Sequence, residues 1–294
     1  MPLRSSPHPP CFTLIELMAA TTVLSVVLLM MVGMQDQMSK AWSNANRRTE
    51  ATREARAGLR MLTEDFLHYY VRDSYTNPST SRANYNPATN TIPIVYFSDA
   101  SKTISGLMIN NAQANSQAIF FLSQRRSSSG KEADQLSAVG YYISSLSETN
   151  VNGFTNTSYH LFRYVNTNVL ANLQSYSTNL ANLFPNVGPP TSASLSSNNE
   201  ILARNALNLR IYFYPTSSVP ASGLIYRIAE NSGTTATNYS GNRCVFELTT
   251  YPETVANSIL QAGSNQSAWT NASNLKRYGR TFEITMDLER SLSK

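Results

Sequence analysis

The chain has 294 residues, of which only 14% are charged, against about 25% in typical soluble domains. Its net charge of +5 permits an anionic partner without requiring one, and its three histidines are too scattered to suggest a metal cluster. The two cysteines, Cys11 and Cys244, exclude a disulfide-rich scaffold. We therefore expect an exported protein, rich in Asn, Ser and Thr, whose fold depends on packing and hydrogen bonds.

The N-terminus combines a polar leader with a long apolar segment. Residues 1–11 contain Pro7, Pro9 and Pro10, which exclude a stable helix there. Residues 12–34 are apolar and would form roughly 34 Å of α-helix, enough to span the hydrocarbon core of a bilayer. This segment is too long for the apolar part of an ordinary secretory signal peptide. A plain signal anchor is the alternative to a processed leader.

Glu16 is the one charged residue within the apolar segment. An unpaired carboxylate at such a position costs several kcal/mol, so a residue of this kind usually has a partner and a function. Glu16 is therefore the main candidate for a functional residue in the N-terminal part.

The helical pattern continues through residues 35–72, which contain no proline and are dominated by good helix formers. Together with the apolar segment they predict one continuous helix of about 60 residues, whose second half packs against a sheet. The predicted buried stripe consists of Ala55, Leu59, Leu62, Phe66 and Tyr69. The opposite face carries Arg47, Arg53, Glu54, Arg56, Arg60 and Glu64. We expect this face to be solvated, with binding of DNA or lipid headgroups as the alternative.

The remaining residues, 73–294, carry the signals of a β-rich head, beginning with a turn-rich stretch at 73–90. Runs rich in β-branched and aromatic residues then predict strands at 92–97, 118–123, 136–143, 159–165, 207–214, 223–228, 243–249 and 281–288. A short helix is expected around residues 168–183. One long helix followed by antiparallel strands predicts the α+β fold class.

The start of the apolar segment, Phe12-Thr13-Leu14-Ile15-Glu16-Leu17, resembles the prepilin processing motif of type IV pilins and type II secretion pseudopilins. The family pattern is a Gly, then Phe-Thr-Leu-Ile-Glu, then an uncharged helix, and here Cys11 stands in place of the Gly. The resemblance implies that a membrane prepilin peptidase cuts between Cys11 and Phe12 and methylates the new amino group of Phe12. The mature chain would then keep Cys244 as its only thiol.

The charge of Glu16 acquires a role if the mature chain begins at Phe12. In a membrane or filament, the cationic amine of Phe12 and the Glu16 carboxylate are each costly alone and tolerable as a pair. If the pair forms between neighbouring subunits, it fixes their axial register. The alternative is that Glu16 lies near the membrane interface and is solvated.

The head resembles a narrower group, the J-type minor pseudopilins of type II secretion, and more closely the pilin-like Verru_Chthon cassette proteins. The resemblance rests on short strand patterns in the order Ala138-Val139-Gly140-Tyr141-Tyr142-Ile143, Leu161-Phe162-Arg163-Tyr164, Ile201-Leu202-Ala203 and Phe282-Glu283-Ile284-Thr285-Met286. In the J-type family the subunit belongs to a small tip complex with other minor pseudopilins. We expect a similar structural role here.

The predicted organisation is a prepilin leader at 1–11, a transmembrane or filament-core helix at 12–34, an amphipathic stalk at 35–72 and the head at 73–294. The sequence contains no HExxH, GxSxG or Walker-type motif, so we expect a non-enzymatic subunit without a cofactor or bound metal. The expected partners are other pilin or pseudopilin subunits, the prepilin peptidase and the inner membrane. The head is expected in the periplasm or outside the cell, and nucleic acid is not an expected partner. The alternative function is a minor pilin that binds DNA for uptake or acts in adhesion.

Overall fold

The computed structural model describes residues 13–69, 94–97, 99–104, 106–114, 116–124, 136–149, 155–167, 169, 180–189, 198–215, 226–229, 236–239, 241–253, 255–256, 273 and 277–287. Cys11, Phe12, the turn-rich stretch at 73–90 and most of the helix expected around 168–183 therefore lie outside the described residues. The chain divides into two compact units, Met1–Arg47 and Arg48–Lys294.

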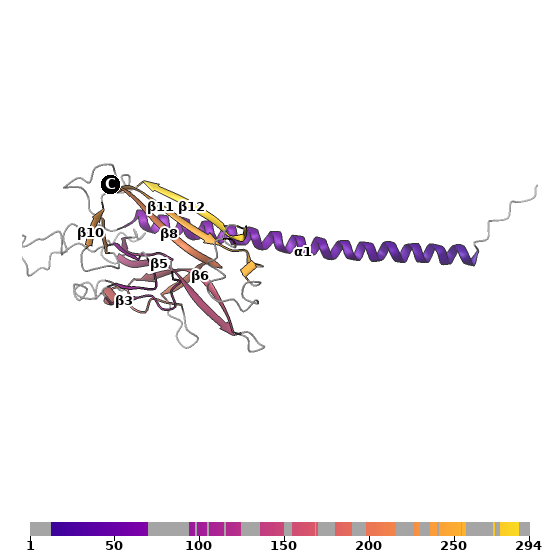
Figure 1. The fold of residues 1–294 in the computed structure, drawn as a ribbon, viewed down its shortest axis with the longest axis horizontal. Coiled ribbons are helices and arrows are strands. Elements are labelled where there is room, and N and C mark those ends of the chain that lie inside the picture. Colours follow the sequence, from indigo (N-terminus) through magenta and orange to yellow (C-terminus); the bar gives the residue numbers. More distant parts are fainter. Residues whose placement is uncertain are drawn as a thin grey trace, which may run out of the picture. The chain divides into compact units, whose positions relative to one another are not determined.

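A single long helix, α1 (Leu14–Leu67), accounts for all of the first described stretch except its ends (Figure 1). It confirms the prediction of one continuous N-terminal helix. It ends earlier than expected, because Tyr69 leaves the helical path and forms an antiparallel bridge with Ser123.

The larger sheet has seven strands in the order β10-β9-β1-β4-β5-β6-β7. Its strands are β1 (Ile94–Phe97), β4 (Ala118–Gln124), β5 (Leu136–Thr149), β6 (Thr155–Asn166), β7 (Asn199–Arg204), β9 (Tyr226–Ala229) and β10 (Ala236–Tyr239). The β5–β6 pair is the longest, with antiparallel partners from Ala138 and Asn166 to Thr149 and Thr155. The pair β1–β9 is parallel, and the other pairings of this sheet are antiparallel.

A second sheet has the order β12-β11-β8 and is antiparallel throughout. It is formed by β8 (Ala206–Pro215), β11 (Gly241–Thr250) and β12 (Arg280–Asp287). The outer edge of β8 is held by the segment before β4: Gln117 N donates to Leu209 O, and Leu209 N donates to Ser116 Oγ. These bonds join the two sheets where β8 would otherwise have an open edge.

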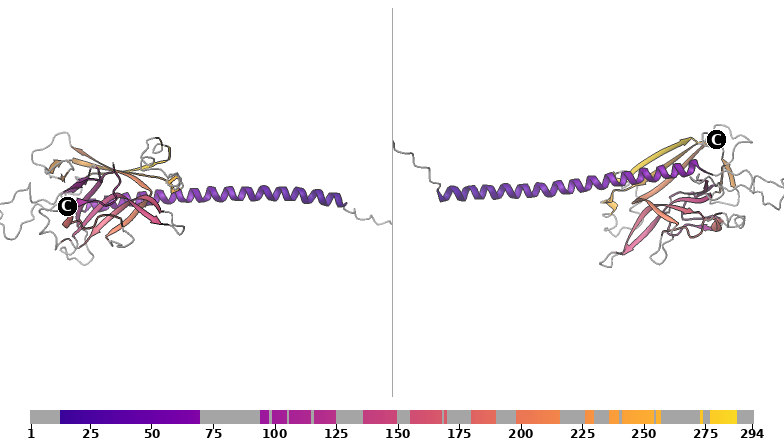
Figure 2. Two further views of the ribbon diagram at one scale, coloured as in Figure 1. Left: turned by 60° about the horizontal axis from the view of Figure 1, so that its bottom comes forward. Right: turned by 180° about the vertical axis from the view of Figure 1, so that it is seen from behind.

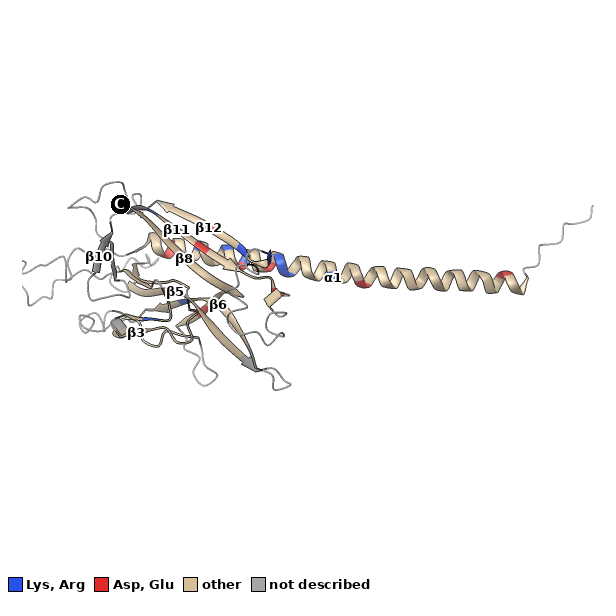
Figure 3. Ribbon diagram, in the orientation of Figure 1, with Lys and Arg blue, Asp and Glu red and all other residues tan. Residues whose placement is uncertain are grey.

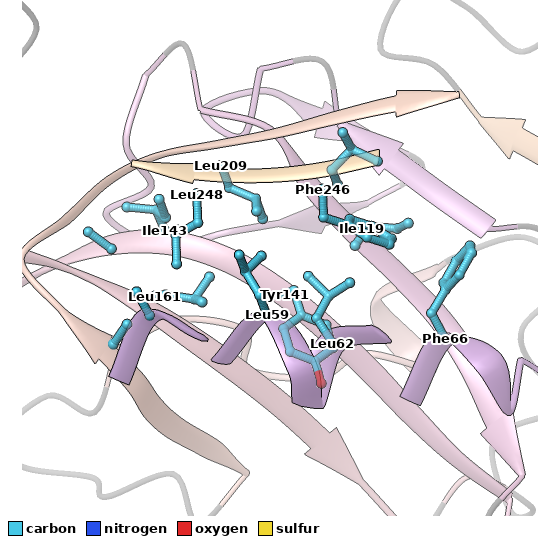
Figure 4. Packing of buried hydrophobic residues seen from close by; sticks show 14 of the residues in the cluster. Leu59, Leu62, Phe66, Ile119, Tyr141, Ile143, Leu161, Leu209, Phe246 and Leu248 are labelled. Atoms are coloured by element: carbon cyan, nitrogen blue, oxygen red, sulfur yellow. The ribbon is translucent and has the colours of Figure 1, made fainter. Parts of the chain in front are cut away.

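Both sheets lie against the part of α1 that belongs to the second unit (Figures 1 and 2). The main core lies between them, and it includes Leu59 and Leu62 from α1, Leu161 from the larger sheet and Phe246 from the smaller sheet (Figure 4). These contacts confirm the α+β class and the packing of a long N-terminal helix on antiparallel sheets. They also confirm the predicted stripe, in which Ala55, Leu59, Leu62 and Phe66 are buried and Tyr69 is partly buried.

A second core covers the other face of the larger sheet. Alternate residues of β4 and β5, such as Phe120 and Tyr142, point into it, and it is closed by Phe184 and Val187 after the 3-10 helix η3 (Leu180–Asn182). A short hairpin, β2 (Thr103–Ile104) and β3 (Leu107–Met108), adds Leu107 to the same core. The central strands β1, β4 and β5 are thus buried on both faces, which is why they are apolar at consecutive positions.

The eight predicted strands all have a counterpart, although β5 and β6 extend farther than expected toward the turn between them. The predicted strand runs did not include β2, β3, β7 and β10, although Ile201-Leu202-Ala203 of β7 was one of the short strand patterns of the family resemblance. Three of these have only two or four residues, and β7 mixes polar and apolar residues at the edge of its sheet.

Candidate functional site

Of the three residues singled out at the N-terminus, Glu16 is described, whereas Cys11 and Phe12 precede the first described residue. Glu16 lies in the first turn of α1, and its carboxylate bonds to Thr13. Its Oε2 atom accepts from Thr13 N at 3.0 Å and from Thr13 Oγ1 at 2.9 Å, while Glu16 N donates to Thr13 Oγ1 at 3.4 Å. This reciprocal arrangement is a capping box, which satisfies amide donors that the helix start leaves open.

The capping box was visible in the sequence as Thr13-x-x-Glu16 but was not recognised there. It adds a local role for Glu16 to the two considered from the sequence, pairing with a neighbour's amine and simple solvation. The second carboxylate oxygen, Oε1, accepts no hydrogen bond within the described part of the chain. Thr13 therefore orients the Glu16 carboxylate through Oε2.

In the apolar stretch of α1 that follows, residues 17–34, every hydroxyl group donates to the helix backbone. Thr21 Oγ1 donates to Met18 O at 2.9 Å, and Ser25 Oγ donates to Thr21 O at 2.8 Å. Thr22 likewise donates to carbonyls of the preceding turn. Because each hydroxyl bonds to the helix backbone, none needs water, which is the requirement for a helix in a hydrocarbon environment.

By length and composition α1 is apolar enough to cross a membrane, and the residues of its most apolar stretch are exposed within the chain. Large side chains such as Leu14, Leu24 and Leu29 contact nothing that would bury them. The uncharged stretch of α1 is the long tan section of the helix in Figure 3. It ends at Asp36, whose carboxylate pairs with Lys40 Nζ at 2.7 Å. A single N-terminal helix of this kind is compatible with a single-pass anchor.

The part of α1 in the second unit holds a charged residue that the sequence did not single out. Asp65 is 0% exposed, and its Oδ2 atom accepts from Tyr141 Oη at 2.6 Å and from Arg163 Nε at 2.7 Å. Its backbone oxygen accepts from Ser123 Oγ at 3.0 Å. The Asp65 cluster (Asp65, Tyr141, Arg163 and Ser123) therefore joins α1 to three consecutive strands of the larger sheet, β4, β5 and β6.

Burial and neighbouring charges keep Tyr141 neutral and Arg163 charged within the Asp65 cluster. Burial, followed by the negative charge of Asp65, raises the pKa of Tyr141 well above its ordinary value, so Tyr141 stays a neutral donor. Burial lowers the pKa of Arg163, but its hydrogen bond with Asp65, the charge of Asp65 and its interactions with Tyr141 together outweigh this, and the net pKa is raised. Arg163 Nη1 also lies 3.7 Å from Glu200 Oε2 at the sheet edge. The cluster is thus a fully paired buried charge that holds helix and sheet together.

A signal for Asp65 existed in the helical period. It lies three residues after Leu62 and next to Phe66, on the stripe predicted to be buried. An acidic residue there implies a buried cation, but the sequence does not reveal which arginine supplies it. Arg163 lies on β6, and only the register of β5 and β6 places it beside Tyr141, the other partner of Asp65.

The charged face of the stalk is solvated with one exception. Arg53, Arg56 and Arg60 are exposed, and none of them forms an ion pair with another described residue. Glu54 is the exception, because it is half-buried and its Oε2 atom accepts from Arg204 N at 3.0 Å. Glu54 thus closes part of the outer edge of β7, whereas the sequence placed it on the solvated face.

Two further reactive side chains are buried in the head. His160 bonds to Ser158 Oγ through Nε2 at 2.8 Å, and burial, followed by the nearby positive charge of Arg204, lowers its pKa to about 4. Cys244 is a free, buried thiol on β11 whose pKa burial raises. Within the described ranges, no group of three or more His, Cys, Asp or Glu is placed to hold a metal ion.

No family model matches the chain, and no curated protein matches it at a significant level.

Proposed function

We propose that this chain is a non-enzymatic structural subunit, of the minor pseudopilin kind, in a filament of the type II secretion or type IV pilus class. The observation that carries the proposal is the position of Glu16. It lies within the prepilin-like motif and in the first turn of an exposed apolar helix, and its Oε1 accepts no hydrogen bond from a described residue. A helix with the head on its C-terminal part and bare apolar residues on its N-terminal part suits a subunit that moves from membrane to filament.

In this proposal a prepilin peptidase removes residues 1–11 in the inner membrane and leaves an N-methylated amine on Phe12. Glu16 of one subunit then accepts from the Phe12 amine of a neighbour, which couples the axial register of the two helices. Thr13 supports this step by holding the Glu16 carboxylate in a single orientation. The head remains on the far side of the membrane and contacts other subunits.

Processing gives the first test. The full chain is expressed with a prepilin peptidase, and the mature protein is examined by N-terminal sequencing and mass spectrometry. We expect a start at Phe12 with one added methyl group, and the same start for Cys11→Gly, because Gly is the family's residue there. A chain that still begins at Met1 in both forms contradicts processing and leaves a simple anchored protein.

Assembly gives the second test, with a matched pair of acidic residues on the exposed part of α1. Glu16→Ala should reduce co-assembly with wild-type subunits by at least ten-fold, measured by cross-linking in membranes, whereas Asp36→Ala should not. Asp36 is the control because it already pairs with Lys40 in its own chain. Equal co-assembly of both variants would remove the role proposed for Glu16.

A second candidate function, DNA binding by a minor pilin, is favoured by Arg53, Arg56 and Arg60. They lie on one exposed helix face at spacings of three and four and are without ion pairs in the described ranges. Filter binding of DNA to the detergent-solubilised chain over a salt series tests this. Replacing all three by Gln should lower the slope of log K against log salt by about 3 if each contacts a phosphate. An unchanged slope contradicts this function.

A further inference from the structure

Trp42 is the only aromatic residue of α1 before Phe66, and it lies just beyond the uncharged stretch. Its side chain is 75% exposed, and Met38, one turn earlier on the same face, is 72% exposed. Neither side chain is covered by another described residue of the chain. The indole is thus open to an environment outside the described residues.

Its depth can be estimated from the helix rise. The segment from Glu16 to Asp36 covers about 30 Å, which equals the thickness of the hydrocarbon core. Trp42 Cα lies about 9 Å beyond Asp36, and each headgroup layer is roughly 5–8 Å thick. Helical side chains lean toward the N-terminus, so the indole covers the turn around Met38. The ring therefore falls within the headgroup layer when the uncharged stretch fills the core.

The opposite side of this turn has the complementary chemistry. Asp36 and Lys40 form their ion pair there, and both side chains are well exposed. The turn from Met38 to Trp42 is thus apolar on one side and charged on the other, at the depth where a bilayer changes from hydrocarbon to water. An indole suits this layer because its ring is apolar and its single N–H can donate to headgroup oxygens.

We propose that the turn from Met38 to Trp42 is a membrane-interface seat, in which Trp42 occupies the lipid headgroup layer on the side of the head. The partner is the surface of a phospholipid bilayer. The seat fixes how deeply the anchor lies before the subunit is withdrawn into a filament. The inference rests on the proposed function, because it requires α1 to span a membrane.

The test uses the two tryptophans of the chain, Trp42 and Trp269. The full-length Trp269→Phe variant, whose only indole is Trp42, is reconstituted in phosphatidylcholine vesicles brominated either near the headgroup or near the chain ends. Trp42 fluorescence should be quenched at least two-fold more by shallow than by deep bromines. A matched control carries Trp42→Phe, Trp269→Phe and Val26→Trp, which places its one indole at the centre of the span. This control should show the reverse order.

The outcomes distinguish the interface position of Trp42 from the membrane span of α1 on which it rests. If the Val26→Trp control is quenched by deep bromines but Trp42 is quenched by neither lipid, the anchor spans the bilayer and the seat is refuted. Blue-shifted Trp42 emission without bromine quenching also refutes it, because the ring is then covered by protein. If neither indole is quenched, the membrane span itself fails, and the inference fails with it.

A second measurement tests whether Trp42 sets how deeply the anchor helix lies in the bilayer. In the Val26→Trp reporter, replacing residue 42 by Ala should shift the ratio of deep to shallow quenching by about two-fold relative to Phe at that position. Tyr at position 42 should return the ratio from the Ala value to the Phe value, since Tyr also has an aromatic ring and adds a donor. Identical ratios for Ala, Phe and Tyr would show that Trp42 does not set the depth.

Discussion

The two parts of α1 meet in one unbroken helix but are stabilised in different ways. In residues 48–67, helix stability comes from a stripe buried against two sheets and from the Asp65 cluster. In residues 14–47, the side chains are exposed, and no described residue of the chain buries the apolar ones. The comparison shows that packing on the head stabilises one end of the helix, whereas the other end has no such packing from the described residues.

The largest loss of stability is expected when Asp65 is replaced. Asp65→Ala leaves the Arg163 guanidinium buried without its partner and should lower the free energy of unfolding of the head by about 3–5 kcal/mol. The measurement is urea unfolding of the detergent-solubilised chain followed by near-UV circular dichroism. Glu64→Ala is the matched control, since Glu64 is the neighbouring exposed acid and should change the value by less than about 0.5 kcal/mol. Similar losses for both variants would contradict the buried-pair account.

The same substitution placed in each part of α1 tests the comparison directly. Leu62→Ala removes a side chain that is 0% exposed in the main core and should destabilise the head by about 2–5 kcal/mol. Leu24→Ala removes an exposed side chain of the apolar stretch and should leave head unfolding unchanged. The same unfolding experiment measures both. If Leu24→Ala destabilises the head as Leu62→Ala does, the N-terminal part of the helix also packs on it.

The head should lose stability in mild acid because of His160. Its folded pKa of about 4 lies below the ordinary value of about 6.5, so between these values the unfolded chain binds a proton that the folded chain does not. Stability is therefore fully present above pH 6.5 and falls by on the order of 3 kcal/mol as the pH drops to 4. Unfolding midpoints from pH 7.5 to 4 measure the slope.

His160→Gln provides the control for that slope, because Gln can keep a bond to Ser158 and does not titrate in this range. The variant should show a flatter dependence between pH 6.5 and 4. If wild type and variant lose stability in parallel, another group is responsible.

The smallest effect is expected at Thr13. Thr13→Ala removes the N-cap hydroxyl that bonds to Glu16 and should cost about 1 kcal/mol in the first turn of α1. Amide hydrogen exchange in micelles should then be faster at Leu17, whose N–H bonds to Thr13 O, and unchanged in the head. Thr13→Ser is the control that keeps the cap. Unaltered exchange in Thr13→Ala would show that the capping box does not stabilise this turn.

Much of the architecture could be predicted from the sequence, because local patterns carry it. The uncharged run and its length predict the anchor helix, and the spacing from Ala55 to Phe66 predicts the buried stripe. In β8, the alternation of Leu207, Leu209 and Ile211 with polar residues predicts a strand with one solvated face, and the structure has it that way. These features depend on residues close together in the chain, so the helical or strand period alone reveals them.

Other features depend on residues far apart in the chain, and the folded arrangement determines them. Asp65 and Arg163 become partners because the register of β5 and β6 and the docking of α1 bring them together. Glu54 contacts β7 for the same reason. The central strands of the larger sheet are buried on both faces because residues near η3 and the β2–β3 hairpin cover their second side. Long-range pairing selects one arginine or one strand edge among many that are locally equivalent. The period of a helix or strand shows which side chains are buried, and the tertiary contacts establish what each of them meets.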